Sequence, residues 1–465
     1  MTALSSSRSI AIIGGGLSGA LVAVHLLRLA RAGTHIVIVE KNPPIGRGVA
    51  YGTDRPEHLL NVPVGRMSVW PDEPDHFFHW VCERLGRLGY PDTVDRNDFL
   101  PRWIFGEYVA QVFAVARQGA SPEVKVETVV GEAIDVEERE SGARVTLVDG
   151  RTYQVDRVVL ALGNLPGEYP IRRSLRFYDG RHYVHTPWHP DALEGIRRTD
   201  DILIVGQGLT GHDMIAQLDR LGHIGKIHAV SRRGLRPLVH ELGQTWPPFF
   251  AGKVIPRTVR EMLHRVREEV RTASQAGIGW RAVVDALRPQ AAELWTALSW
   301  EERSRFMRHL RPFWEIHRHR IPPQTAEVIQ RLVAAGRLKF YAGRLESLRD
   351  LPSGGAEAVF RRRGTSDWVT LKVAKVINCT GPRSDYSKYQ HPLLINLLAR
   401  GLIDHDPLAL GLHALPGGEV FRYRGAPVGW LYTLGAPLKS SLWECTAVPE
   451  IRVHALTLAR VLLAT

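Results

Sequence analysis

The stretch "IAIIGGGLSGALVAVHLL" (10–27) decides the first part of the fold. Its first four residues are apolar and predict a buried strand, and Gly14, Gly16 and Gly19 then follow at GxGxxG spacing. These glycines permit a tight turn, close approach of the backbone to a pyrophosphate, and close packing of the next helix on the strand. The amide groups at the start of that helix point toward an anion. The stretch therefore predicts a strand, a phosphate-binding turn and a helix.

A second predicted strand, "HIVIVE" (35–40), ends in Glu40, 21 residues after Gly19. A carboxylate at this position accepts hydrogen bonds from a ribose diol and repels a 2′-phosphate, which suits the adenosine ribose of FAD. The alternative is a glycine-rich turn in an unrelated α/β protein. We expect the FAD contacts of this unit to include Gly14, Gly16, Leu17, Ser18, Gly19, Glu40 and Lys41.

A second copy of this strand–turn–helix motif lies in the middle of the chain, at "ILIVGQGLTGHDM" (202–214). The interval from Gly206 to Arg232 is 26 positions, the same as from Gly14 to Glu40, so a guanidinium takes the place of the carboxylate. A hydroxyl and two guanidinium groups in "SRR" (231–233) suit a 2′-phosphate, which favours NADPH over NADH. The alternative for the arginines is a solvated surface turn. The expected contacts are Gly206, Gly208, Leu209, Thr210, Gly211, Ser231, Arg232 and Arg233.

Two further segments, "DRVVLALGNLPG" (156–167) and "AKVINCTGPRSD" (374–385), are apolar strands that run into a turn with glycine. Each comes at the end of one nucleotide-binding unit, and they add Ala161, Gly163 and Gly381 to the expected cofactor contacts. Together these signals predict an α/β fold with two Rossmann-like dinucleotide-binding domains, one for FAD and one for NADPH.

The remaining segments complete the predicted domain organisation. Residues 124–138 and 143–156 are expected to form a β-meander with a hairpin turn at 149–150. We predict an FAD-binding domain from residues 1–190 and 383–465, and an NADPH-binding domain from 195–382 that carries a long helical insertion at 237–330. The insertion could be a substrate lid, an oligomer interface or a dock for a partner.

Composition excludes several other classes. A chain of 465 residues with 44% hydrophobic content can bury two cores. Its net charge of +12 is spread out with no nucleic-acid-binding motif, so we expect no nucleic-acid partner. Cys82, Cys379 and Cys445 are scattered, which indicates no disulfide framework, no metal site and no redox dithiol, and fits a reducing cytoplasm. Because glycines interrupt the apolar run 10–27, we expect no membrane span there.

The chain resembles the bacterial FAD/NAD(P)-binding protein family, relatives of the class B flavin-containing and N-hydroxylating monooxygenases. The resemblance covers nearly the whole length. The stretches that carry it are "GRGVAYG" (46–52), "HLLNVPVGRMSVWPDEPDHFFHW" (58–80), "RNDFLPRWIFGEY" (96–108), "GLTGHDM" (208–214), "AVSRRGLRPLVH" (229–240), "RHLRPFWEIHRHR" (308–320) and "LYTLGAPLKSSLWECTAVPEIR" (431–452).

The resemblance implies an active-site residue and further flavin contacts. Asn61 matches an Asn that lies beside the flavin C4a region in the family pattern, and we expect it to be catalytic. The turn before the final helix, near Glu444, would place backbone N–H groups by the flavin pyrimidine ring. The further expected contacts are Gly48, Met67, Ala133, Gly435, Ala436 and Trp443. Arg96, Phe99 and Tyr108 align loosely with a segment of the N-hydroxylating enzymes, and ordinary packing is the alternative.

Two stretches depart from simple expectations. "FYDGRHYVHTPW" (177–188) stands where flavin-containing monooxygenases carry FxGxxxHxxx(Y/W), but the spacing from Gly180 to His185 is one residue too long and that from His185 to Trp188 one too short. Arg181, His185 and Trp188 are still expected at the domain junction. His317 and His319 lie two apart, on different sides of a helix, so we expect no metal there but a basic face that contacts a phosphate, a partner subunit or solvent.

The resemblance implies that NADPH reduces a bound flavin. The leading interpretation is a monooxygenase in which O2 and the reduced flavin form a C4a-(hydro)peroxide that transfers oxygen to a nitrogen or sulfur of a small substrate. One alternative is an NADPH-dependent reductase that passes electrons to an acceptor or partner protein. A second alternative is a non-enzymatic flavin-binding redox sensor or scaffold. The sequence names neither the substrate nor the oligomeric state.

Overall fold

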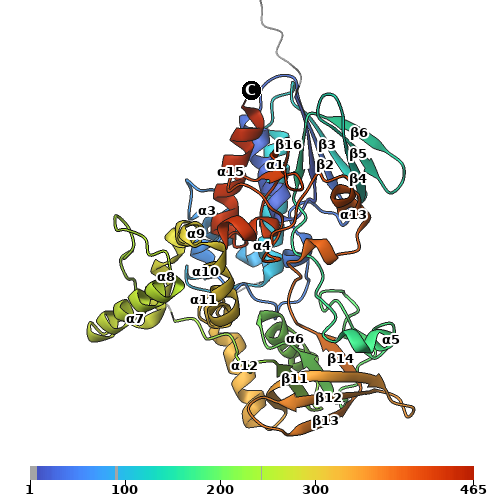
Figure 1. Ribbon diagram of the computed structural model, residues 1–465, viewed down its shortest axis with the longest axis vertical. Helices are drawn as coiled ribbons and strands as arrows, with labels where there is room; N and C mark the ends of the chain where they lie inside the picture. Colours follow the sequence, from blue (N-terminus) through green and yellow to red (C-terminus); the bar gives the residue numbers. More distant parts are fainter. Residues whose placement is uncertain (1–7, 90–92, 242, 465) are drawn as a thin grey trace, which may run out of the picture.

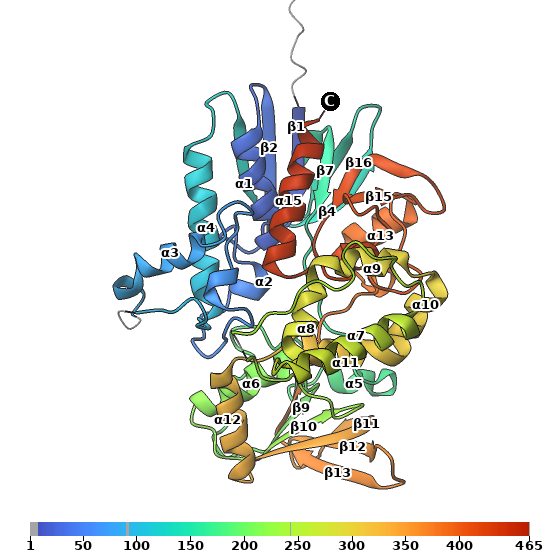
Figure 2. The same cartoon turned by 90° about the vertical axis from the view of Figure 1, so that its left-hand side faces the viewer.

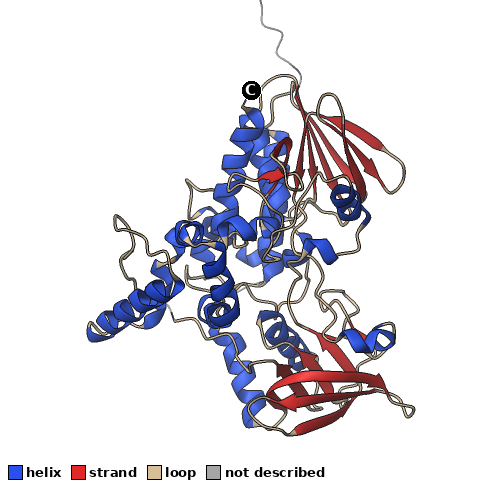
Figure 3. Ribbon diagram, viewed as in Figure 1, coloured by secondary structure: helices blue, strands red, loops and turns tan. Residues whose placement is uncertain are grey.

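The computed structural model describes residues 8–89, 93–241 and 243–464. Figure 1 shows strands gathered at opposite ends of the molecule, and Figure 3 shows helices packed along them and between the two ends. We call the larger end, which holds both termini of the described chain, the first unit, and the other end the second unit. The expected α/β fold with two dinucleotide-binding units is confirmed.

The first unit is built on a six-stranded sheet in the order β15-β16-β7-β1-β2-β3, in which only β15 runs antiparallel to its neighbour. Its strands come from both ends of the chain. The apolar runs at 10–13 and 36–39 are buried, as suits strands inside a parallel sheet that is covered on both faces. They are β1 (Arg8–Ile13), β2 (Thr34–Glu40), β3 (Lys125–Val130), β7 (Arg157–Leu160), β15 (Glu419–Phe421) and β16 (Pro427–Thr433).

One face of this sheet carries the first glycine-turn helix, α1 (Leu17–Leu29), which packs between α15 (Val448–Leu463) and α4 (Arg102–Gln118). Residues 17–27 of α1 are all buried, because neighbours cover it on every side. The shorter helices of the first unit are α2 (Gly48–Tyr51), η1 (Val64–Arg66), α3 (His76–Cys82), η2 (Leu85–Leu88), α13 (Pro392–Ala399), η6 (Tyr386–Lys388), η7 (Ala436–Leu438) and α14 (Lys439–Leu442).

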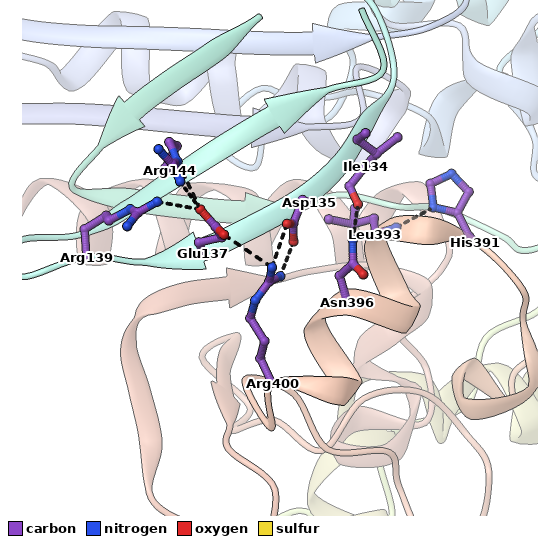
Figure 4. A network of polar contacts seen from close by, with 9 residues as sticks. All are labelled: Ile134, Asp135, Glu137, Arg139, Arg144, His391, Leu393, Asn396 and Arg400. Carbon is purple, nitrogen blue, oxygen red and sulfur yellow. Dashed lines mark hydrogen bonds and ion pairs between the residues drawn. The ribbon is translucent and has the colours of Figure 1, made fainter. Parts of the chain in front are cut away.

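The expected β-meander is shorter than predicted. It holds β4 (Ala133–Glu138), β5 (Ala143–Leu147) and β6 (Thr152–Val155), whereas β3 pairs parallel with β2 at the edge of the six-stranded sheet. The prediction was wrong for β3 because an exposed edge strand has the same alternating pattern as a meander strand. Figure 4 shows how Arg400, after α13, pairs with Asp135 and Glu137 of β4 and so fastens α13 to the meander.

The second unit is built on a seven-stranded sheet in the order β13-β12-β11-β10-β9-β14-β8. β11 pairs parallel with β10 along its first part and antiparallel with β12 along its second part. Its crossover helices are α6 (Leu209–Arg220) and α12 (Pro323–Ala334), which contact each other. The strands are β8 (Tyr183–Val184), β9 (Ile202–Val205), β10 (Ile227–Ser231), β11 (Leu338–Asp350), β12 (Ala356–Arg362), β13 (Trp368–Val373) and β14 (Lys375–Asn378).

The connector between the units differs in part from the expected division at residue 190. β8 pairs with β14, so residues 183–184 belong to the second sheet. The short helices η3 (Arg172–Ser174) and α5 (Leu175–Tyr178) precede β8. The chain returns to the first unit beside this connector, where Leu165 and Arg383 form an isolated antiparallel bridge. The two crossings between the units therefore lie side by side.

The helical insertion leaves the second unit after β10. Figures 1 and 2 show its helices beside the region between the two sheets. They are α7 (Val259–Gln275), α8 (Trp280–Ala286), η4 (Arg288–Gln290), α9 (Ala291–Ala297), α10 (Trp300–Arg305), a π-helix at Phe306–Leu310, and α11 (Arg311–Arg318). Among the described residues, no helix is both long and apolar enough to cross a membrane.

Candidate functional site

The first glycine turn is sterically closed to side chains at two of its glycines. Gly14 has a φ of 103°, and a Cβ on it would lie 2.3 Å from the carbonyl oxygen of Ala161. A Cβ on Gly19 would lie 1.9 Å from the carbonyl oxygen of Gly14. The turn is therefore packed against the loop after β7 on one side and against its own helix on the other, as the sequence predicted for a strand–turn–helix device.

The mouth of this turn, at Gly16, is less crowded than its base. A Cβ on Gly16 would meet only Gly48 Cα, at an ordinary contact distance of 3.5 Å. Glu40 accepts hydrogen bonds from the backbone N–H of Gly15 at 2.6 Å and of Asn42 at 2.7 Å, so its carboxylate is fixed beside the turn. Each carboxylate oxygen keeps a lone pair for a further donor such as a ribose hydroxyl.

The loop before α15 reaches the same place. A Cβ on Gly435, whose φ is 75°, would lie 2.7 Å from Ser18 Oγ in the first turn of α1. The structure thus brings together most residues that we predicted to hold FAD. They are Gly14, Gly16, Leu17, Ser18, Gly19, Glu40, Gly48, Ala161, Gly435 and Ala436.

Four other predicted contacts have different surroundings. Lys41 is directed to Glu132, with Nζ 2.9 Å from Oε1. Met67 is 2% exposed and belongs to the hydrophobic core of the first unit, and Ala133 is a buried residue of β4. Gly163 has a φ of 63° and accepts a hydrogen bond from the hydroxyl of Tyr386. Their roles toward a cofactor stay predictions.

The second glycine turn repeats the geometry of the first. Gly206 has a φ of 116°, and a Cβ on it would lie 2.0 Å from the carbonyl oxygen of Cys379 in the loop after β14. A Cβ on Gly211 would lie 2.5 Å from Gly206 O. Within the described part of the chain, no heavy atom comes within 4 Å of a Cβ built on Gly208 or on Gly381. The second turn therefore has the same closed base and open mouth, with Leu209 and Thr210 half-buried at the start of α6.

Gln207 was not predicted as a site residue, although it fills the variable position of "GQG". It is buried, and its amide donates to the carbonyl oxygens of Ala229 at 2.7 Å and Tyr341 at 2.9 Å, which ties the turn to β10 and β11. Its Oε1 accepts from Ser231 Oγ at 3.1 Å. Gln207 thus orients the Ser231 hydroxyl, while Arg232 and Arg233 are exposed at the end of β10.

Asn61 lies at the junction of the two units. Its carbonyl oxygen accepts a hydrogen bond from His240 Nε2 at 2.9 Å, and the His240 ring packs on Phe99 with centroids 5.0 Å apart. Burial, reinforced by the charge of Arg320, lowers the pKa of His240 to about 4. The ring is therefore neutral at pH 7 and binds Asn61 through its Nε2–H tautomer.

Other motif residues divide between packing and the junction. Tyr108 is completely buried, and its hydroxyl lies 2.8 Å from His76 Nδ1, while Arg96 pairs with Asp75. Trp188 contacts the first unit through the ring of His58, whereas His185 packs on Tyr169 at 4.7 Å. Arg181 is exposed and contacts the ring of His182.

The basic segment of α11 is not the solvated face that was one expectation. His317 packs edge-on against Trp280 at 4.8 Å, and His319 Nε2 lies 3.6 Å from Glu315 Oε2. Arg320, directly after it, is 1% exposed and pairs with Asp285. The sequence could not reveal this, because the groups that cover these side chains come from α8 and from the segment itself. No metal-binding cluster of His, Cys, Asp or Glu occurs in the described residues.

Glu444 ties the insertion to the turn before α15. Its Oε1 accepts from the indole N–H of Trp314 at 2.8 Å, and its Oε2 lies 3.4 Å from Arg318 Nε. The Arg318 and Glu444 side chains are only 11% and 9% exposed. The helical insertion is therefore fixed on the first unit at the loop that also reaches the first glycine turn.

Trp443 occupies a strained turn at this contact. Its φ is 58° and its ψ −64°, and Glu444 N donates to Leu442 O at 2.7 Å, which together define a γ-turn with a positive φ. Its ring stacks on Trp295 of α9 at 5.0 Å. Its indole N–H is buried and has no hydrogen-bond partner among the described residues. The structure places Trp443 against the insertion, and its contact with flavin stays a prediction.

Comparisons with known proteins agree with this geometry. Residues 11–165 match the model of the FAD-NAD(P)-binding family. No curated protein matches the sequence. Among solved structures, the chain is similar to L-lysine 6-monooxygenase of Pseudomonas syringae, with 17% identity, a TM-score of 0.65, and 98% of this chain and 99% of that one covered.

Two other solved structures are similar to this chain over nearly its whole length. Ornithine N-hydroxylase of Kutzneria sp. 744, solved with reduced FAD, NADP⁺ and L-ornithine, has 13% identity and a TM-score of 0.65, with 98% of this chain and 99% of that one covered. Thioredoxin reductase of T. acidophilum has 10% identity and a TM-score of 0.51, with 98% of each chain covered. Residues 11–165 therefore match the model of the FAD-NAD(P)-binding family, and the whole chain shares the overall fold of these solved structures.

Proposed function

We propose that the chain is an FAD- and NADPH-dependent oxidoreductase. The observation that carries the proposal is the matched pair of glycine turns. The base of each turn packs on a partner loop, which is the loop after β7 for the first turn and the loop after β14 for the second, and the mouth of each is left for a pyrophosphate. A single nucleotide would need only one such device, and the structure keeps both intact at opposite units. FAD would bind the first turn, where Glu40 supplies a ribose acceptor, and NADPH would bind the second.

The second site has features that suit the extra phosphate of NADPH. Ser231 presents a hydroxyl that Gln207 orients, and Arg232 and Arg233 are exposed beside it. Guanidinium groups bind phosphate through paired hydrogen bonds. When both nucleotides are bound, NADPH supplies the hydride and the flavin accepts it, while the protein's own groups bind, orient and exclude water.

We further propose monooxygenation as the reaction, with oxygen transferred from a flavin C4a-(hydro)peroxide to a nitrogen or sulfur of a small substrate. The end-to-end likeness to the lysine and ornithine hydroxylases supports this, since those proteins act on small amines. The likeness to thioredoxin reductase favours a plain reductase as the second candidate. Against a dithiol reductase, Cys82, Cys379 and Cys445 are all free thiols in separate parts of the fold.

Rapid mixing tests the proposal. The purified protein should be yellow with bound FAD, and NADPH should reduce that flavin anaerobically faster than NADH does. On mixing with O2, a monooxygenase should show the absorbance of a flavin C4a adduct before oxidised flavin returns, and Asn61→Ala should shorten its lifetime. Fast reduction with no adduct, with or without NADP⁺ and a panel of small amines, would instead support the reductase. A flavin that NADPH does not reduce would support a sensor or scaffold.

A further inference from the structure

Four of the motif stretches, far apart in the sequence, converge on one buried contact between the two units. Arg102 stands at the start of α4 in the first unit, and Asp213 lies in α6 of the second. Arg102 Nη2 donates to Asp213 Oδ2 at 2.7 Å, and the two side chains are only 14% and 9% exposed. His58 and Trp188, from two further stretches, surround this pair.

Two hydrogen bonds within the first unit and the ring of Trp188 together fix the position of Arg102. The guanidinium Nε donates to the carbonyl oxygen of Leu59 at 3.0 Å, and the backbone N–H of Arg102 donates to His58 O at 2.8 Å. The face of Trp188 lies 5.2 Å from the guanidinium carbon, and the His58 ring meets Trp188 edge-on at 5.5 Å. Arg102 therefore presents a fixed donor to the second unit, and its pairing with Asp213 costs little further side-chain entropy.

Asp213 connects this donor to the second glycine turn. It lies two residues after Gly211 in the first turns of α6, so a rigid helix joins its carboxylate to the turn. His240 makes a second contact across the junction, to the carbonyl oxygen of Asn61, which lies two residues after Leu59. The short segment 58–61 of the first unit thus holds Arg102 through Leu59 and contacts the start of the helical insertion through Asn61.

Stability alone does not account for such a pair. Removing two charges from water is costly, and their attraction seldom repays the full cost, so a buried ion pair is weak evidence of a stabilising role. Burial raises the pKa of Asp213 although Arg102 opposes that change, which shows that desolvation outweighs attraction here. A buried pair whose two side chains are each held in place instead fixes the relative position of the two units that carry them.

We infer that Arg102 and Asp213 are positioning residues that hold the second glycine turn, and with it the NADPH bound there, in the orientation from which hydride reaches the flavin of the first unit. This inference rests on the proposed function. In the step concerned, NADPH and FAD become NADP⁺ and FADH⁻, with two electrons and one hydrogen nucleus moving together as hydride. Neither residue exchanges a proton or an electron in that step.

The experiment compares Arg102→Met and Asp213→Asn with a matched control, Asp219→Asn. Asp219 lies on the same helix but pairs with Arg331 of α12 inside the second unit. For each protein we would measure FAD content, the Kd for NADP⁺, and the rate of flavin reduction at saturating NADPH. Both junction variants should reduce flavin at least about tenfold more slowly while FAD content and the NADP⁺ Kd change less than about threefold. The double variant should be no slower than either single one, because both remove one interaction.

A second readout does not depend on NADPH chemistry. Spin labels at Val130→Cys and Leu221→Cys, two exposed sites in different units, report the distance between the units in a Cys82→Ser background. The distance distribution should be narrow in the parent and in Asp219→Asn, and broad in both junction variants. If NADPH fails to reduce the parent, the proposed function falls, while broadening still supports positioning by this pair. Unchanged distributions, an unchanged reduction rate, or a rate lost only in proportion to nucleotide binding would each overturn the inference.

Discussion

Replacing Gly16 by Ala should separate cofactor affinity from the stability of the apoprotein. Gly16 has a φ of −65°, which Ala adopts without strain, and the new methyl would meet only Gly48 Cα at 3.5 Å. Lower chain entropy in the unfolded state favours Ala by about 0.4–1 kcal/mol, and the loss of glycine as the helix N-cap costs a similar amount. The free energy of unfolding of the apoprotein should therefore change by less than about 1 kcal/mol.

FAD binding should respond much more strongly. The methyl group would occupy the open mouth of the turn, where the pyrophosphate must approach the backbone. Loss of one charge-assisted hydrogen bond is worth about 1.5–3 kcal/mol, which corresponds to a Kd raised roughly 10- to 150-fold. Titration of apoprotein with FAD, followed by quenching of flavin fluorescence, measures the Kd, and thermal unfolding of the apoprotein measures stability.

The neighbouring glycine supplies the control. Gly14→Ala would force a φ of 103° on Ala and place its Cβ 2.3 Å from Ala161 O, so the apoprotein itself should be destabilised. An unchanged FAD Kd in Gly16→Ala would refute the placement of the pyrophosphate. A loss of apoprotein stability equal to that of Gly14→Ala would refute the description of this turn as closed at its base and open at its mouth.

Three further results are expected. Gly208→Ala, which has open space around its Cβ, should raise the KM for NADPH by an order of magnitude and leave the melting temperature unchanged; a matching loss of stability would contradict the open mouth. Arg232→Ala combined with Arg233→Ala should raise the KM for NADPH about tenfold more than that for NADH, and equal effects on both nucleotides would reject their role toward the 2′-phosphate. Burial lowers the pKa of His58 to about 3 and that of His240 to about 4, so the unfolded state takes up protons below pH 6.5 that the fold excludes. Stability from these groups is present above pH 6.5 and should be lost as the pH falls toward 4, and His58→Gln should reduce the slope of melting temperature against pH in that range.

The glycine turns could be predicted because their requirement is local. A residue without a Cβ is needed where the chain turns at positive φ against a neighbouring loop. Gly14 and Gly206 meet this requirement, and glycine at these positions can be seen in the sequence alone. The two partner loops were predictable for a related reason, since each follows an apolar strand at a matching place in its unit. Sequence spacing therefore predicted the two strand–turn–helix units and the later strand that ends each of them.

The junction could not be predicted in the same way. Arg102 and Asp213 are separated by 111 positions, and each alone is an ordinary charged residue near the start of a helix. Trp443 was expected beside flavin from its place before the last helix, but what surrounds it depends on how an insertion more than a hundred residues earlier packs. Such contacts depend on the relative placement of whole units, which periodicity and spacing do not encode.

The chain leaves the first unit near Leu165 and returns to it near Arg383, so the whole second sheet is synthesised before the first sheet is complete. All strands of the seven-stranded sheet lie within residues 183–378, so that sheet can assemble on the ribosome while β16 and α15, which complete the other sheet and cover α1, have not yet been made. At about 5–20 residues per second, translation from the end of β14 to the end of α15 takes roughly 4–17 s. During that interval the apolar sides of β7 and α1 lack their final neighbours, and the nascent chain offers them to solvent or to a chaperone.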